Sequence, residues 1–175
     1  PADAVAGDTV NGLDDPIVLT QDDIDAKQIT AQVQAPAEGD PLDLSVTITD
    51  VAGNESEPGT ASATVDTTSP GGDDGSDAPV LAIAEADDNY ISADEISDGI
   101  QAVVTLTAGT EEGDTVTVTL TDSAGDTHEF THTVTGAETT GGQVEMTLTG
   151  SFAEGAASTV AVITDEAGNS SANSN

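Results

Sequence analysis

Apolar and polar residues alternate along several short segments of this chain, which is the pattern of half-buried β-strands. The clearest segment, 114–121, places Val116, Val118 and Leu120 on one face and threonines on the other. Short strands separated by turn residues at this spacing are typical of antiparallel β-sandwiches. The pattern therefore predicts an all-β protein, in which further strands of the second part of the chain lie at 79–85, 99–108, 127–135, 143–149 and 157–164.

An eight-residue phrase occurs twice in the sequence. Thr-Asp-Val-Ala-Gly-Asn-Glu-Ser at 49–56 returns as Thr-Asp-Glu-Ala-Gly-Asn-Ser-Ser at 164–171, which is 115 residues later. Each copy follows a β-type run, and a period of about 100 residues predicts tandem domains. In the first copy we expect strands at 28–34, 42–49 and 60–66.

Both copies are expected to be incomplete Ig-like β-sandwich domains. Aligned on the phrase, residues 1–68 are the C-terminal part of such a domain, without its N-terminal strands, and residues 79–175 lack the last strand. Residues 69–78 between them are rich in Gly and Asp and predict a flexible acidic linker. Open sheet edges would remain in both copies, and such edges are prone to strand exchange with a neighbouring molecule.

The charge of the chain limits its partners. It carries 34 acidic residues against a single base, Lys27, and its formal net charge is −33. A nucleic-acid-binding surface needs several Lys or Arg side chains, and an anionic membrane surface would repel this chain. No apolar run approaches the roughly 18 residues that span a bilayer. Acidic chains with few aromatics are often disordered, but the sustained alternating runs argue for folded domains.

Several phrases together resemble one family. Besides the Thr-Asp-x-Ala-Gly-Asn phrase, these are Ala-Thr-Val-Asp-Thr-Thr-Ser-Pro at 63–70, Asp-Asn-Tyr-Ile-Ser-Ala-Asp-Glu at 88–95 and Gly-Asp-Thr-Val at 7–10 and 113–116. They resemble the bacterial Ig-like extender repeats of giant RTX-type, type I-secreted surface adhesins of Gram-negative bacteria. The resemblance implies a secreted or cell-surface location and neighbouring repeats stiffened by Ca²⁺ at their junctions. One departure is the insertion 71–77, because such repeats usually join the Thr-Thr-x-Pro phrase directly to the next strand.

Acidic and amide side chains gather in the loops at the two poles of each expected sandwich. Ca²⁺ takes about six to eight oxygen ligands from carboxylates, carbonyls and water, whereas Mg²⁺ needs a more regular cage. Transition metals favour imidazole or thiolate, which are scarce in a chain with two His and no Cys. We therefore expect Ca²⁺, with these candidate ligands: Asp50, Asn54, Asp66, Asp87, Asn89, Asp94, Glu95, Asp114, Asp165 and Asn169.

The segment His128-Glu-Phe-Thr-His132 matches the zinc-protease motif H-E-x-x-H. That motif needs a helix, and here it lies in a threonine-rich segment that predicts a strand. On a strand, residues four apart are separated by about 13 Å, so one zinc cannot bind both imidazoles. We expect no catalytic residue and no enzymatic activity.

Three other interpretations remain open. The module could itself bind a glycan, a protein or ice, because Thr115, Thr117, Thr119 and Thr121 could form a flat array on a strand. An enzyme would show activity that depends on His128 and His132. General halophilic acidity without specific sites would make KCl stabilise the chain as well as millimolar CaCl₂ does.

Overall fold

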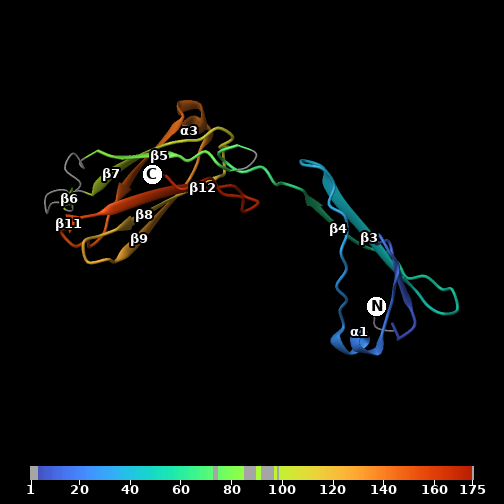
Figure 1. Cartoon of the computed structure of the whole chain (residues 1–175). Helices are drawn as coiled ribbons and strands as arrows, with labels where there is room; N and C mark the ends of the chain where they lie inside the picture. Colours follow the sequence, from blue (N-terminus) through green and yellow to red (C-terminus); the bar gives the residue numbers. More distant parts are fainter. Residues whose placement is uncertain (1–3, 73–74, 85–89, 92–96, 98, 175) are drawn as a thin grey trace. The chain divides into compact units, whose positions relative to one another are not determined.

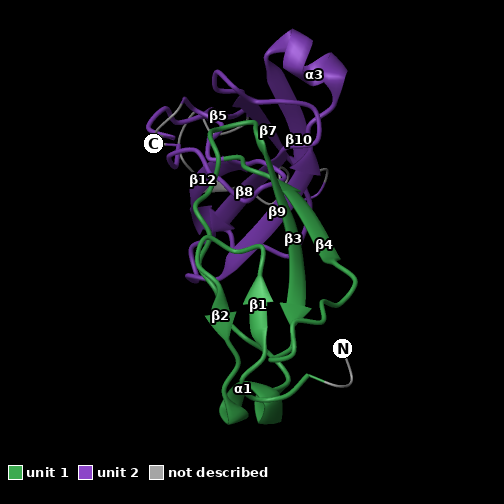
Figure 2. Ribbon diagram, turned by 90° about the vertical axis from the view of Figure 1, so that its right-hand side faces the viewer, with its two compact units in different colours: residues 1–66 green, residues 67–175 purple. Residues whose placement is uncertain are grey.

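The computed structural model describes residues 4–72, 75–84, 90–91, 97 and 99–174 (Figure 1). The chain divides into two compact units, unit 1 at Pro1–Asp66 and unit 2 at Thr67–Asn175 (Figure 2). Strands in antiparallel sheets dominate both units, so the chain is an all-β protein, as its alternating pattern predicts. Among the described residues, no helix has the length and apolar character needed to cross a membrane.

The described part of unit 2 contains two three-stranded sheets and a short two-stranded one. The first sheet has the order β10-β7-β5, formed by Gln143–Leu148, Ile100–Thr105 and Val80–Ile83. The second has the order β12-β8-β9, formed by Ser158–Thr164, Thr115–Thr121 and Thr127–Thr133. The remaining pair is β6 (Tyr90–Ile91) with β11 (Gly155–Ala156), and α3 (Gly136–Gly141) connects β9 to β10. Every strand that the sequence predicts in 79–175 is confirmed, with ends shifted by a few residues.

The core of unit 2 forms between the two three-stranded sheets. Val116, Val118 and Leu120 point inward from β8 and are at most 1% exposed, as the alternation predicts. They pack in one apolar cluster with Val104 of β7 and Val144 of β10. Most of the side chains are small, and Phe152 is a large member of the same cluster. Burial of this cluster by both sheets supplies the main stabilisation of unit 2.

Unit 1 has one sheet with the order β2-β1-β3-β4. Its strands are Ile17–Val18, Thr9–Asn11, Pro41–Thr49 and Gly59–Thr64, and α1 (Gln21–Ala26) follows β2. The predicted strands at 42–49 and 60–66 are confirmed by β3 and β4. The predicted strand at 28–34 is wrong, because this segment pairs with no described strand. Its alternating residues are suited to a strand, but a strand also needs a neighbour to which it can hydrogen bond.

The two units repeat one local plan at the same 115-residue interval. Thr20 caps α1 and Thr135 caps α3, and each helix has a capping box that is completed by Asp23 or Glu138. The sequence pattern did not predict these helices, because six residues without a buried side chain leave no apolar stripe. The Thr-x-x-Asp/Glu spacing was the signal that could have found them.

Residues 69–72 and 75–78 belong to unit 2, whereas their Gly and Asp content predicts a flexible linker between the domains. Gly71 N donates to Ala108 O at 2.8 Å, and Asp77 N donates to Gly71 O at 3.0 Å. Pro70 is among the fully buried residues. The described part of this segment is therefore packed and hydrogen-bonded, despite its Gly and Asp content.

Candidate functional site

The loop after β3 is closed by the carboxylate of Asp50. Its Oδ1 accepts hydrogen bonds from Ala52 N at 2.9 Å and Asn54 N at 2.8 Å, and its Oδ2 accepts one from Asn54 Nδ2 at 2.8 Å. Gly53 has φ of 91°, a left-handed conformation that favours glycine. The phrase Asp-x-Ala-Gly-Asn thus specifies a self-closed turn, in which each polar group has a structural role.

The loop after β12 repeats this arrangement. Asp165 Oδ1 accepts from Gly168 N at 2.7 Å and Asn169 N at 2.8 Å, and Oδ2 accepts from Asn169 Nδ2 at 2.9 Å. Asn169 Nδ2 also lies 3.5 Å from the backbone oxygen of Thr68. The loop therefore brings a carboxylate, a side-chain amide and a backbone carbonyl together at one end of unit 2.

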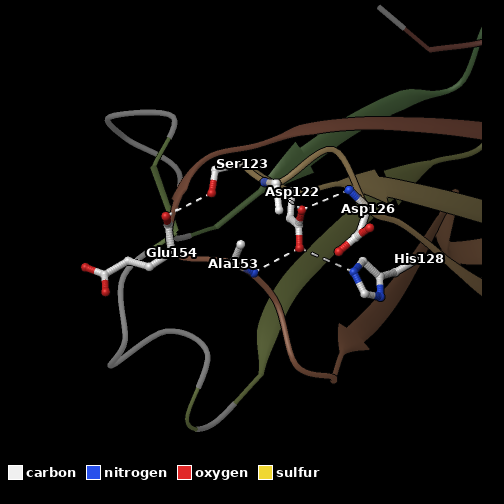
Figure 3. Close-up of polar contacts among 7 residues, drawn as sticks. Asp122, Ser123, Asp126, His128, Ala153 and Glu154 are labelled. Atoms are coloured by element: carbon white, nitrogen blue, oxygen red, sulfur yellow. Dashed lines mark hydrogen bonds and ion pairs between the residues drawn. The ribbon is translucent and has the colours of Figure 1, made fainter.

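A third copy of the loop joins β8 to β9, and Figure 3 shows its contacts. Asp122 Oδ1 accepts from Ala124 N at 2.9 Å and Asp126 N at 3.1 Å, while Oδ2 accepts from Ala153 N at 2.9 Å. His128 Nε2 lies 3.5 Å from the same Oδ2. From the sequence alone, this segment was predicted only as a turn. The pattern Asp-x-Ala-Gly-Asn/Asp was the signal, since Asp126 stands where the other copies have Asn.

Hydrogen bonds to the three loop aspartates keep them ionised. Bonds from Asn54 lower the pKa of Asp50, and the bond from Ala153 N is the main cause of the lowered pKa of Asp122. Burial acts to raise the pKa of Asp165, but bonds from Asn169, Gly168 and Ala167 outweigh it and the net direction is downward. All three loops therefore present charged carboxylates at neutral pH, which is the state that a hard cation needs.

Two buried aspartates stand at the same sheet ends as these loops. Asp8 and Asp114 are 3% and 4% exposed, and each accepts a hydrogen bond from the backbone three residues earlier, Val5 N at 2.9 Å and Glu111 N at 2.8 Å. Since Thr9 pairs with Thr49 and Thr115 with Thr164, each buried aspartate lies beside one Asp-x-Ala-Gly-Asn loop. Asp114 is among the predicted ligands and Asp8 is not, although both belong to a Gly-Asp-Thr-Val phrase.

One carboxylate oxygen of Asp8 is left without a partner. This atom, Oδ1, is buried and has no hydrogen-bond partner among the described residues. An unpaired buried carboxylate oxygen is costly, so this atom is suited to a cation or a water molecule. It lies at the end of unit 1 where the Asp50 loop also ends.

The structure brings some of the predicted calcium ligands together and separates others. Asp50 and Asn54 share one loop, Asp165 and Asn169 share another, and Asp66 is exposed at the end of unit 1. Among the residues that the structure describes, no three His, Asp or Glu side chains form a cluster that could hold a metal ion. Four predicted ligands lie outside the described residues: Asp87, Asn89, Asp94 and Glu95.

The two histidines lie on strand β9, as the threonine-rich pattern predicts. They contact different carboxylates, because His128 faces Asp122 whereas His132 Nε2 lies 2.9 Å from Oε1 of Glu138. The two histidines of the H-E-x-x-H sequence are therefore spaced as residues of a strand. The two imidazoles have separate partners at the two ends of β9.

No protein-family model matches this sequence, and a search of curated proteins finds no significant match. The fold itself defines the class, an all-β protein built of antiparallel sheets in two units.

Proposed function

We propose that this chain is a structural extender module of a bacterial cell-surface adhesin. In this proposal, tandem Ig-like β-sandwich domains project a ligand-binding region away from the cell, and neighbouring repeats and Ca²⁺ are the partners. The supporting observation is the recurrence of one local plan in the two units. A capped helix and a self-closed Asp-x-Ala-Gly-Asn loop recur at an interval of 115 residues, and each unit also has a buried aspartate, Asp8 or Asp114, which are 106 residues apart. Tandem repetition of a small β unit suits a spacer, because length increases with each copy.

Charge supports a role for calcium in this proposal. A net charge of −33 opposes compaction unless cations offset it, and the three loops hold their carboxylates ionised. The residues that would hold Ca²⁺ in unit 2 are Asp165 and Asn169, with the Thr68 carbonyl beside them. Each carboxylate oxygen that accepts a hydrogen bond retains a lone pair, and Ca²⁺ accepts carbonyl and water oxygens as further ligands. A bound cation would supply charge neutralisation and a rigid joint.

A second candidate function, a module that binds a glycan, protein or ice, has one observation in its favour. The outer face of the β12-β8-β9 sheet is rich in threonine, and the register places Thr115 between Thr133 and Thr164 and Thr117 between Thr131 and Val162. Glu129 is the charged residue among the outward positions of these three strands. A nearly uncharged face in so acidic a chain could contact a neutral ligand.

Thermal unfolding tests the calcium part of the first proposal. The chain would be heated in EDTA, in about 2 mM CaCl₂ and in NaCl at matched ionic strength. Specific sites that bind at micromolar Kd would raise the melting temperature with Ca²⁺ alone, since ligand at about 1,000 times Kd adds about 4 kcal/mol. If NaCl and CaCl₂ raised the melting temperature equally, the salts would act on the acidic loops only by charge screening. That result would overturn the calcium part of the proposal.

A further inference from the structure

Asn11 and Gly12 form the only Asn-Gly pair in the sequence, and they stand where β1 ends. Asparagine is among the thermally labile residues of proteins. It is most labile before glycine, because glycine has no side chain to hinder its backbone nitrogen from attacking the asparagine side chain. The pair is therefore a candidate site of spontaneous deamidation, and its surroundings decide whether the folded chain can react.

Asn11 is held in the sheet by its backbone and by its side chain. Its backbone pairs with Thr47 of β3, and β1 is a central strand with β2 on its other side. Its side-chain Nδ2 donates to Thr49 Oγ1 at 2.9 Å and lies 3.4 Å from the carbonyl oxygen of Thr9. A rotation of Asn11 would therefore break both the strand pairing and the hydrogen bonds of its amide.

Gly12 is fixed against the same strand. Its φ is 92°, a left-handed conformation that favours glycine. A Cβ at this position would overlap the backbone oxygen of Ser45, so the backbone of Gly12 packs directly on β3. Packing therefore requires glycine here, although glycine makes the preceding asparagine labile.

Deamidation needs a geometry that the end of β1 does not have. The backbone nitrogen of Gly12 loses its proton to solvent and bonds to Cγ of Asn11, while the bond from Cγ to Nδ2 breaks and the side-chain nitrogen leaves as ammonia. Water then opens the five-membered succinimide at one of its two carbonyls, which gives aspartate or isoaspartate at position 11. Closing this ring requires Cβ of Asn11 and the nitrogen of Gly12 to eclipse each other, so ψ must leave the value of about +135° that an antiparallel strand has.

We propose that Asn11 is a deamidation site that the pairing of β1 with β3 protects. The side chain reacts when the two strands separate and is held unreactive while they are paired. Deamidation thus marks those molecules in which this part of the sheet has opened. The proposal depends neither on calcium nor on a role in adhesion.

The product changes the sheet. A carboxylate at position 11 cannot donate to Thr49 Oγ1, and it would face the carbonyl oxygen of Thr9. Isoaspartate also adds one carbon to the backbone, which disturbs the register of β1 on β3. A deamidated chain should therefore re-form this pairing less stably, and its β1 amides should exchange faster with solvent than those of the unmodified chain.

Mass spectrometry of the whole chain tests the proposal. The chain is incubated at mildly alkaline pH in buffer and in concentrated urea, and is then digested with trypsin. Trypsin cleaves after Lys27, the only base in the sequence, and Asn11 is the one asparagine in residues 1–27, so the mass gain of this peptide reports the site. Deamidation should be at least about tenfold slower in buffer than in urea, because only the open fraction reacts. A synthetic peptide of residues 8–15, incubated in both solutions, corrects for the effect of urea itself.

Three substitutions locate the protection. Thr49→Val removes the acceptor of the Asn11 amide and should speed the reaction in buffer about two- to tenfold, whereas Thr49→Ser keeps the hydroxyl and should react as wild type. Thr47→Val is the matched control, because Thr47 Oγ1 donates to Glu55 Oε1 and does not hold the amide. In urea all four chains should react equally, since the sequence around Asn11 is the same.

Hydrogen exchange of β3 shows whether each variant keeps unit 1 folded, and the wild-type comparison decides the matter if one does not. Equal rates of the wild-type chain in buffer and in urea would overturn the proposal. So would an unreactive Asn11 in urea, or a folded Thr49→Val chain that reacts at the wild-type rate.

Discussion

His132 and Glu138 join strand β9 to the first turn of α3: Nε2 of His132 lies 2.9 Å from Oε1 and 3.0 Å from Oε2 of Glu138. Glu138 Oε2 also accepts hydrogen bonds from Thr135 N at 2.8 Å and Thr135 Oγ1 at 2.7 Å. One carboxylate thus completes the helix cap and holds the histidine of the neighbouring strand.

This contact predicts a stability change in acid. His132, followed by Thr135, lowers the pKa of Glu138 from its ordinary value of 4.5 to about 2. A group whose pKa is lowered on folding stabilises the native state above its unfolded pKa, and this stabilisation is lost as the pH falls through the folded value. The difference in stability between wild type and Glu138→Gln should therefore be largest near pH 5 and decrease as the pH falls toward 2. Melting temperatures across this range measure it.

Glu154→Gln is the matched control, because Glu154 is exposed and its substitution should not change the pH profile. A difference between wild type and Glu138→Gln that stays constant from pH 5 to pH 2 would contradict the assignment.

Substitution of Asp165 is expected to destabilise the fold even without calcium. Asp165→Ala removes the acceptor of three hydrogen bonds from Gly168 and Asn169, and should lower the free energy of unfolding by about 1–2 kcal/mol in EDTA. Glu166→Ala changes an exposed residue of the same loop and should cost less than about 0.5 kcal/mol. Urea unfolding measures both, and equal effects of the two substitutions would rule out the closing role of Asp165.

Two adjacent glycines, Gly71 and Gly72, are expected to differ in how well they tolerate substitution by alanine. A Cβ at Gly71 would lie 2.4 Å from the backbone oxygen of Asp77, whereas a Cβ at Gly72 would meet nothing within 4 Å. Both have positive φ, so both alanine substitutions share the conformational cost. Gly71→Ala should destabilise unit 2 by about 1–3 kcal/mol more than Gly72→Ala, because its backbone must also move. Equal unfolding midpoints would show that the segment is not packed in solution.

Two leucine substitutions, one in each unit, test the difference in burial between the core of unit 2 and the sheet face of unit 1. Leu120 is 1% exposed in the core of unit 2, and Leu120→Ala should cost about 2–5 kcal/mol. Leu44 lies partly buried on a sheet face of unit 1, and Leu44→Ala should cost less than about 1 kcal/mol. Local hydrogen exchange of β8 and β3 reads each unit separately. A large loss of protection in β3 would contradict the exposure of this face.

The sequence predicted most strands of unit 2 because alternation and turns are local signals. It also predicted which candidate ligands share a loop, since Asp50 and Asn54, like Asp165 and Asn169, are four residues apart. It could not predict that their side chains bond to each other, or that Asp8 has a buried oxygen without a partner among the described residues. Those facts depend on strand register, which brings distant segments to the same sheet end.

By itself, the sequence determined the all-β class, the strand faces, and the turns of the repeated phrase, because each follows from side-chain period and short-range hydrogen bonding. Tertiary structure alone decided which of these segments became paired strands. Gln143–Leu148 and residues 28–34 carry similar alternation, yet β10 has β7 beside it and the segment in unit 1 has no described strand. A strand's hydrogen bonds are made with a neighbour distant in sequence, so pairing and burial are properties of the assembled sheet.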